Sequence, residues 1–249
     1  TSLRVLFLFT TSLWFIISLI AAIPFFYQLP ALSFSQAFYE SCSGLSTSGS
    51  TVITHLDQRP RAILLWRGIL QYIGGVGFVA LAVVILPISA MGGMSIFKTE
   101  SYSFDDSAKF TPHLKTMAIS LFVWYVAILV LCSFFFVLGG FDLFRAIVTA
   151  LSTVSTGGMT PTDTQMNDAS VFNQYTAIGF MFISSCPFLL ILASLSGNPL
   201  LFFKDQQVRG YFFINFIVAL AVGISLIVVN QYDLEKAFRV ALFNVVSIT

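Results

Sequence analysis

Two stretches of this chain, QAFYESCSGLSTSGST (residues 36–51) and RAIVTALSTVSTGGMT (residues 145–160), decide its fold because one repeats the other. They superpose without gaps at an offset of 145 − 36 = 109 residues. The identical pairs are Ala37 and Ala146, Ser43 and Ser152, Ser46 and Ser155, Thr47 and Thr156, Gly49 and Gly158, and Thr51 and Thr160. Internal repetition indicates one structural unit used twice. Each stretch is therefore expected to form the same short helix followed by the same polar loop.

The segments around the two stretches are long, apolar and almost free of charge. A helix that crosses the hydrocarbon core of a bilayer needs about 20 apolar residues. Five runs reach this length, and spans are expected over residues 3–26, 62–90, 116–141, 175–195 and 210–232. Within the fourth run, Pro187 predicts a kink, with a hinge as the alternative. The short helices within 32–45 and 142–154 cannot cross, which predicts that they enter the membrane and turn back.

The composition agrees with this pattern. Of the 249 residues, 57% are hydrophobic and 9% are charged, against about 25% charged in an average soluble domain. The sequence therefore predicts an all-α polytopic membrane protein that has a lipid bilayer as its solvent. A net charge of +1 gives no basic face for nucleic acid. The three cysteines lie far apart, and their pattern predicts neither a disulfide framework nor a transition-metal site.

The repeat also predicts how the chain is organised. A first helix–loop–helix unit is expected over residues 1–91 and a second over 116–195, joined by a polar linker at 92–115. After another polar linker at 196–209, a third unit is expected to begin at 210–249, because VALFNVVSIT (240–249) places Ala241 on Ala37 and Ser247 on Ser43. This third copy stops before its loop, and the chain starts at Thr1 without an initiator Met, directly in an apolar run, so both chain ends are expected to be cuts through a longer protein.

The hydroxyl and glycine loops point to a binding chemistry based on oxygen atoms. Irregular backbone at membrane depth is tolerated only inside protein or along a watery cavity. Glycine permits unusual dihedral angles, so carbonyl groups can turn inward, as they do in the filter of potassium channels. The C-terminal end of each short helix also carries a partial negative charge. Both features favour a cation as the ligand.

The motifs resemble those of the Trk/Ktr/HKT superfamily of potassium transporters, most closely the bacterial TrkH/TrkG type of pore subunit. The stretches that carry the resemblance are FYESCSGLSTSGSTV (38–52), WRGILQYIGGVGFVALAVVILP (66–87), GGMSIFKTE (92–100), ALSTVSTGGMTPTD (150–163) and ALFNVVSIT (241–249). The resemblance implies four tandem helix–re-entrant loop–helix repeats around one pore, of which this chain holds about two and a half.

The resemblance also implies which residues contact the ion. Selectivity-filter carbonyls are expected from Thr47, Ser48, Gly49, Thr156, Gly157 and Gly158, flanked by Ser46, Ser50 and Ser155. The first loop reads STSG where the family often has TTTG, and serine at position 48 keeps both a carbonyl and a hydroxyl group. Potassium would be the transported ligand, and no covalently bound cofactor is expected.

The resemblance further implies a place in the cell and partners. It suggests potassium uptake across a bacterial inner membrane, with the pore loops facing outside. It also suggests a homodimer of the full-length protein, bound to a cytoplasmic ring of nucleotide-binding regulatory subunits. Charge counting leaves the orientation open, because the two sides carry equal numbers of basic residues.

Two other functions compete with a selective pore. One is a secondary carrier that couples potassium to sodium or protons, although a broken-helix carrier would typically show inverted repeats. The other is a membrane-embedded enzyme, for which the sequence offers neither paired intramembrane carboxylates nor a nucleophile with a base.

Several individual residues have two possible functions. Gly74, Gly75 and Gly77 could form a nucleotide loop, but close helix packing is favoured. Arg67 could be a functional charge or could snorkel to the interface. Glu40 could attract cations or accept hydrogen bonds from the backbone behind the loops.

Overall fold

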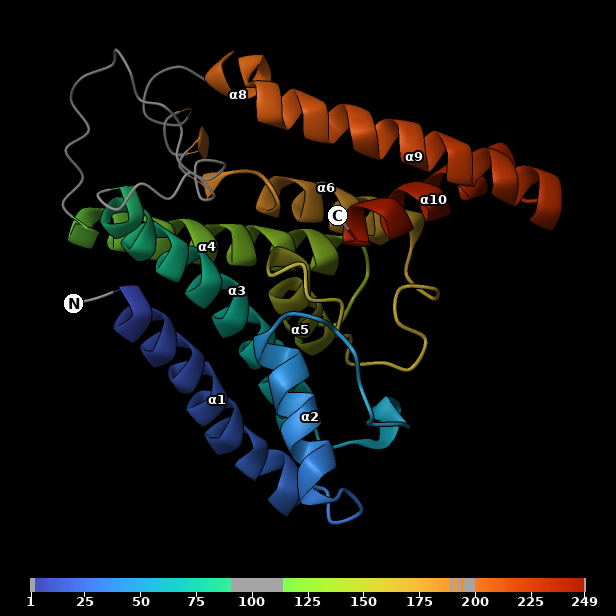
Figure 1. Cartoon of the computed structure of the whole chain (residues 1–249). Helices are drawn as coiled ribbons and strands as arrows, with labels where there is room; N and C mark the ends of the chain where they lie inside the picture. The colour runs from blue at the N-terminus through green and yellow to red at the C-terminus, as the bar shows by residue number, and fades with distance from the viewer. Residues whose placement is uncertain (1–2, 91–113, 189, 192–193, 195–199, 249) are drawn as a thin grey trace.

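The computed structural model describes residues 3–90, 114–188, 190–191, 194 and 200–248 of the chain, and all regular elements in this part are helices. Figure 1 shows their arrangement. The helices are α1 (Leu3–Gln28), α2 (Phe34–Leu45), η1 (Leu56–Gln58), α3 (Arg61–Ala90), α4 (Leu114–Leu138), α5 (Leu143–Val154), α6 (Val171–Ser184), α8 (Leu200–Lys204), α9 (Gln206–Asn230) and α10 (Leu234–Ile248). The expected all-α fold is confirmed.

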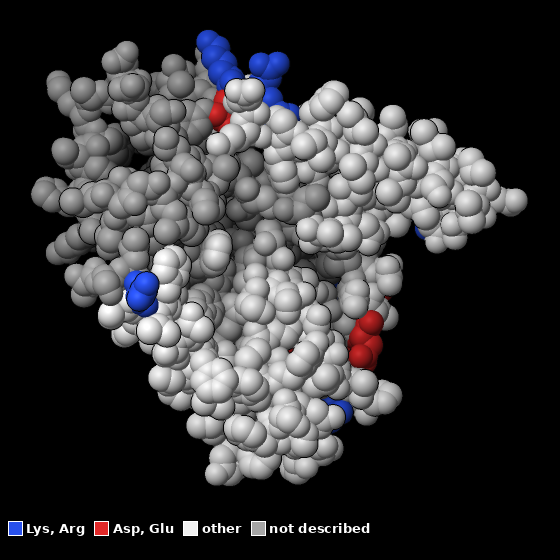
Figure 2. Space-filling view, in the orientation of Figure 1, with Lys and Arg blue, Asp and Glu red and all other residues white. Residues whose placement is uncertain are grey.

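Four of the described helices, α1, α3, α4 and α9, are long and apolar enough to cross a membrane. Their outward faces carry large apolar side chains in contact with the surroundings, such as Phe9 of α1 and Val228 of α9. On the face shown in Figure 2, charged atoms gather at a few places and leave most of the described surface white. Only a hydrocarbon solvent suits so much exposed apolar surface, so the chain is a multi-pass membrane protein.

The two short helices begin and end at equivalent positions of the repeat. Ser33 caps the N-terminus of α2 by accepting a hydrogen bond from the backbone of Gln36, and Asp142 caps α5 in the same way through Arg145. Such caps satisfy backbone N–H groups that have no partner inside the helix. Each short helix packs on the long helix that precedes it, α2 on α1 and α5 on α4, and α10 repeats this arrangement on α9.

Helix α3 lies between the two short helices and contacts both. Of the four candidate spans it is the most buried, with 39% of its apolar window inside the protein against 17% for α1 and α9. Glycines permit the close approach. A Cβ atom at Gly74 would lie 2.0 Å from the carbonyl oxygen of Leu45 at the end of α2, and one at Gly75 would lie 3.0 Å from the Cβ of Ser155. The packing interpretation is confirmed for Gly74 and Gly75, whereas a Cβ atom at Gly77 would lie 3.8 Å from the Trp14 ring, an ordinary contact distance.

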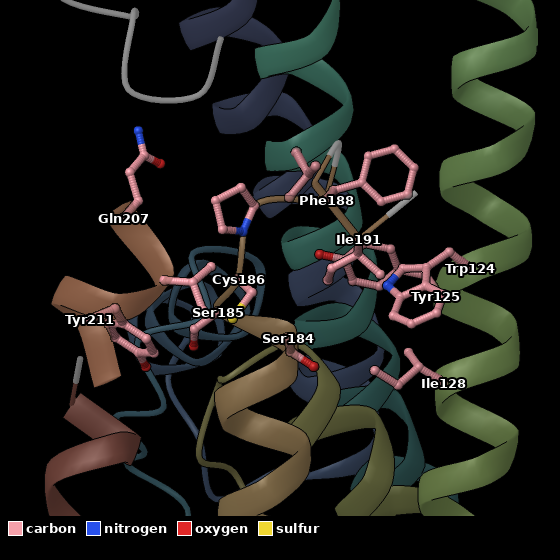
Figure 3. A pocket seen from close by; sticks show the side chains of 13 residues that line it. Trp124, Tyr125, Ile128, Ser184, Ser185, Cys186, Phe188, Ile191, Gln207 and Tyr211 are labelled. Carbon is pink, nitrogen blue, oxygen red and sulfur yellow. The ribbon is translucent and has the colours of Figure 1, made fainter. Parts of the chain in front are cut away.

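The fourth expected span differs from its prediction. Helix α6 begins at Val171 and ends at Ser184, and the chain turns through residues 185–187 before helical residues resume. The residue before a proline is disfavoured in α-helical conformation, so Pro187 interrupts the helix where a kink or a hinge was expected. Figure 3 shows the pocket at this interruption, lined by Trp124 of α4, the turn itself and Tyr211 of α9.

The expected linkers are only partly visible. Residues 92–113 of the first linker and 196–199 of the second lie outside the described residues. The rest of the second linker is helical apart from Asp205, because α8 occupies Leu200–Lys204 and α9 begins at Gln206. Asp205 starts α9 by accepting hydrogen bonds from the backbone of Gln207 and Val208. The cap extends α9 into the polar segment, beyond the apolar run that hydropathy detects.

Candidate functional site: two facing polar loops

The loops after α2 and α5 have the same backbone conformation at equivalent residues. Ser46 and Ser155 end their helices with ψ of 0°. Thr47 and Thr156 follow in left-handed conformation with φ of 55° and 53°, and Gly49 and Gly158 have φ of 76° and 78°. The hydrogen bonds repeat as well. The backbone N–H of Ser48 donates to Ser43 O at 3.1 Å, and that of Gly157 donates to Ser152 O at 2.9 Å.

The left-handed threonines are costly. This helix ending usually places glycine at the left-handed position, and a β-branched residue there is an outlier that costs about 1–2 kcal/mol. Both Thr47 and Thr156 adopt this unfavourable conformation. Strained residues of this kind cluster at binding and catalytic sites. The repeated strain therefore marks the two loops as a functional site.

The two loops touch one another. A Cβ atom at Gly49 would lie 2.2 Å from the carbonyl oxygen of Gly157, so the first loop reaches the second only because residue 49 has no side chain. Gly49 is partly exposed, Ser48 is exposed and Gly157 is buried. The structure thus brings the six expected ligand residues into one place, although they come from segments about a hundred residues apart.

A cavity of about 710 Å³ lies beneath the junction. Its wall includes the last residues of both short helices and the start of both loops, namely Leu45, Ser46, Thr47, Val154, Ser155 and Thr156. None of the described residues that line it carries a charged side chain. Because a helix C-terminus carries a partial negative charge, two such ends at one uncharged cavity create a potential that favours a cation.

A buried ion pair supports the loops from behind. Glu40 of α2 is fully buried, and Arg67 of α3 is 2% exposed. Arg67 Nε donates to Glu40 Oε1 at 2.8 Å, and Arg67 Nη1 donates to the carbonyl oxygen of Thr160 at 3.2 Å. The Glu40 carboxylate also accepts from the Thr51 hydroxyl and the Val52 N–H. Glu40 therefore accepts hydrogen bonds from the chain behind the first loop. Because Arg67 is buried in an ion pair, the interpretation that it snorkels to the interface is wrong.

Gln71, one helical turn beyond Arg67, was missed by the sequence interpretation. Its side chain is fully buried. Its amide nitrogen donates to the carbonyl oxygen of Gly157 at 2.7 Å, and its amide oxygen accepts from the backbone N–H of Met159 at 3.3 Å. The available signal was its spacing of four residues from Arg67, which puts both polar groups on one face of an otherwise apolar helix.

The flanking serines differ in their surroundings. Ser155 is buried and its hydroxyl donates to Leu151 O at 2.9 Å, whereas Ser46 and Ser50 are exposed. In the described part of the chain no group of three or more His, Cys, Asp or Glu residues could hold a metal ion.

Outside the membrane-spanning helices, an ion pair fixes the segment after the second loop. Both terminal guanidinium nitrogens of Arg145 donate to the carboxylate of Asp168, at 2.6 and 2.9 Å, and Arg145 also lies over the ring of Phe141. These hydrogen bonds lower the pKa of Asp168 below its usual value. The pair ties the start of α5 to the connection that leads to α6.

The fold and the site define a class: an all-helical membrane protein with repeated re-entrant loops that gather backbone oxygens at a cavity. Residues 2–249 match the family model TrkH, described as cation transport protein. The chain belongs to this family of cation transport proteins.

Individual relatives are similar over nearly the whole chain. The chain is 34% identical to the Trk system potassium uptake protein TrkH of Vibrio parahaemolyticus, over 98% of this chain and 51% of that protein. It is 30% identical to the Trk system potassium uptake protein TrkG of Escherichia coli, over 93% of this chain and 48% of that protein. The crystal structure of the potassium transporter TrkH from Vibrio parahaemolyticus matches with a TM-score of 0.83 at 33% identity, covering 97% of this chain and 50% of that one. The chain thus spans about half the length of these relatives.

Proposed function

We propose that this chain forms part of the pore of a potassium uptake protein. The relatives are named as potassium uptake proteins. The observation that carries the proposal is the contact of two Ser/Thr/Gly loops of the same backbone conformation beside a cavity whose described lining residues are uncharged, with two helix C-termini at its wall. Carbonyl oxygens in such loops can replace the hydration shell of a potassium ion.

The proposed ion ligands are the carbonyl groups of Thr47, Ser48 and Gly49 in the first loop and of Thr156, Gly157 and Gly158 in the second. The carbonyl oxygen of Gly157 already accepts from Gln71. A carbonyl oxygen has two lone pairs, so this bond leaves one for an ion. The exposed Ser46 and Ser50 and the buried Ser155 would flank the row of ligands.

The proposed organisation follows the repeat. Residues 1–91 and 116–195 form two helix–loop–helix units, the linkers are 92–115 and 196–209, and 210–249 begins a third unit. Separate apolar cores support this division, since α1, α2 and α3 supply most of the cluster around Phe25, while α4, α5 and α6 supply most of the cluster around Phe136. Four such units would surround one ion path.

We further propose the setting in the cell. The protein would lie in the bacterial inner membrane with its loops facing outside. It would work as a homodimer with a cytoplasmic ring of nucleotide-binding regulatory subunits. These statements rest on the resemblance of the motifs to those of the Trk/Ktr/HKT superfamily and on the naming of the relatives as proteins of a Trk system.

The experiment is potassium uptake by cells that lack their own uptake systems and express the full-length protein. The wild type should restore uptake and prefer potassium to sodium. Gly49→Val should abolish selective uptake while the protein still inserts, because a Cβ at Gly49 meets the carbonyl oxygen of Gly157. Gly179→Val, in α6, is the matched control, since no described atom lies within 4 Å of its Cβ position. Normal selectivity in Gly49→Val would refute the assignment.

A further inference from the structure

We infer that Gln71 is a positioning residue that sets the ion selectivity of the second loop, through a fit between its amide group and the missing side chain of Gly157. The inference rests on the proposed function. Gln71 belongs to α3, which comes from the first unit, whereas Gly157 belongs to the second. One side chain of the first unit thus fixes the backbone of the second loop.

The contact has two points of attachment. The amide of Gln71 donates to Gly157 O at 2.7 Å and accepts from Met159 N at 3.3 Å. A planar amide that bonds two backbone groups two residues apart fixes both the position and the tilt of the peptide units between them. These units include the carbonyl of Gly158, one of the proposed ligands. Full burial of Gln71 excludes water as a competing partner.

Gly157 is matched to this amide. A Cβ atom at Gly157 would lie 2.5 Å from both Cδ and Nε2 of Gln71, closer than real Cβ contacts come. The amide therefore occupies the space that a side chain at residue 157 would need. The two residues depend on each other, because any side chain at 157 would displace Gln71 and break both hydrogen bonds.

The first loop is held in a different way at the equivalent position. Ser48 stands where the second loop has Gly157, and its hydroxyl lies 2.9 Å from that of Ser43 in its own helix. The Ser43 hydroxyl also donates to the carbonyl oxygen of Ser50, the residue equivalent to Met159. The first loop thus receives its support from its own unit, and the second receives it from α3.

The selectivity experiment uses the full-length protein in cells and compares potassium with sodium uptake. Gln71→Leu keeps the volume but leaves Gly157 O and Met159 N without their partner, and Gln71→Glu replaces the donor by an acceptor. Both should lower the potassium to sodium uptake ratio about tenfold, the factor that corresponds to 1.4 kcal/mol. Ile73→Ala, at a 49% exposed residue of the same helix, should leave the ratio unchanged.

A double substitution tests the proposed fit. Gly157→Ser alone should reduce the ratio, because its Cβ meets Gln71. Adding Gln71→Ala removes the obstruction and lets the new hydroxyl approach Ser152, as Ser48 approaches Ser43, so the pair should recover part of the ratio lost in Gly157→Ser.

The outcomes separate the two proposals. A wild type without potassium uptake refutes the proposed function and this inference with it. A selective wild type whose ratio persists in Gln71→Leu, while uptake falls only with the amount of protein in the membrane, refutes the inference alone. A double variant that recovers nothing relative to Gly157→Ser also counts against it, because the residues would then act independently.

Discussion

Replacement of Arg67 by methionine should destabilise the protein strongly. Methionine fills much of the space but leaves the Glu40 carboxylate, which is 0% exposed, without its positive partner. Removing one member of a buried ion pair costs about 3–5 kcal/mol. The Thr51 hydroxyl and the Val52 N–H still donate to Glu40, so we expect the lower end, about 3 kcal/mol. For a cooperative unit of this size, that free energy lowers the melting temperature by about 6–12 °C.

The assay is thermal unfolding of the purified protein in detergent, with a double-mutant cycle. Glu40→Gln combined with Arg67→Met leaves neither charge unpaired, so the double variant should be more stable than the sum of the single effects predicts, by about 1–3 kcal/mol. Arg61→Met is the matched control. Arg61 is exposed and contacts the Phe144 ring at 5.3 Å, so its loss should cost less than about 1 kcal/mol.

Two results would refute this reasoning. If Arg67→Met unfolds within about 1 °C of the wild type, the Glu40 carboxylate has another source of compensation. If the two substitutions are additive, the contact of 2.8 Å between Arg67 and Glu40 contributes no coupling energy.

Two further substitutions test the packing of α3 and the loop after α5. Gly74→Ala should lower the melting temperature and reduce uptake, because its Cβ would lie 2.0 Å from Leu45 O, whereas Gly179→Ala has open space among the described residues; equal effects in the two thermal melts would contradict this. Asp168→Asn should cost about 0.5–1 kcal/mol at pH 7, the range of an exposed ion pair. Because the contact with Arg145 lowers the pKa of Asp168, its stabilisation is complete above the unfolded value of about 3.9 and is lost as the pH falls through the folded value. The melting temperatures of wild type and variant should therefore approach one another as the pH falls below about 4 and converge once the pH is below the folded value, and a difference that stays constant throughout this fall in pH would count against the ion pair.

The sequence predicted the short helices closely because their boundaries depend on local signals. The expected start and end of the second one, 142–154, match its N-cap Asp142 and its last residue Val154. The prediction of the fourth span failed because it used hydropathy alone and not such local signals. Hydropathy detects an apolar run but not where the helical backbone breaks, and the run at 175–195 stays apolar across the interruption at Pro187.

The candidate site could be located from the sequence, but its supports could not. Equal spacing of the Ser/Thr/Gly runs was enough to pair the two loops. The functions of Glu40 and Arg67 stayed open because they depend on which helix faces which loop. That arrangement is set by tertiary packing, above all by the glycines through which α3 approaches α2 and α5.

In the two copies of the repeat, the residues that set the loop backbone are the same, and the residues that contact neighbouring elements differ. Positions that determine local conformation are identical in the two copies, such as the left-handed threonines and the glycines two residues later. Positions that contact the surroundings differ, as Ser48 does from Gly157 and Ser50 from Met159. If several copies in a single polypeptide form one ion path, as proposed, no exact symmetry relates them. Each loop can keep the same backbone only if its own neighbours hold it, so the divergent positions of further repeats should identify the side chains that support their loops.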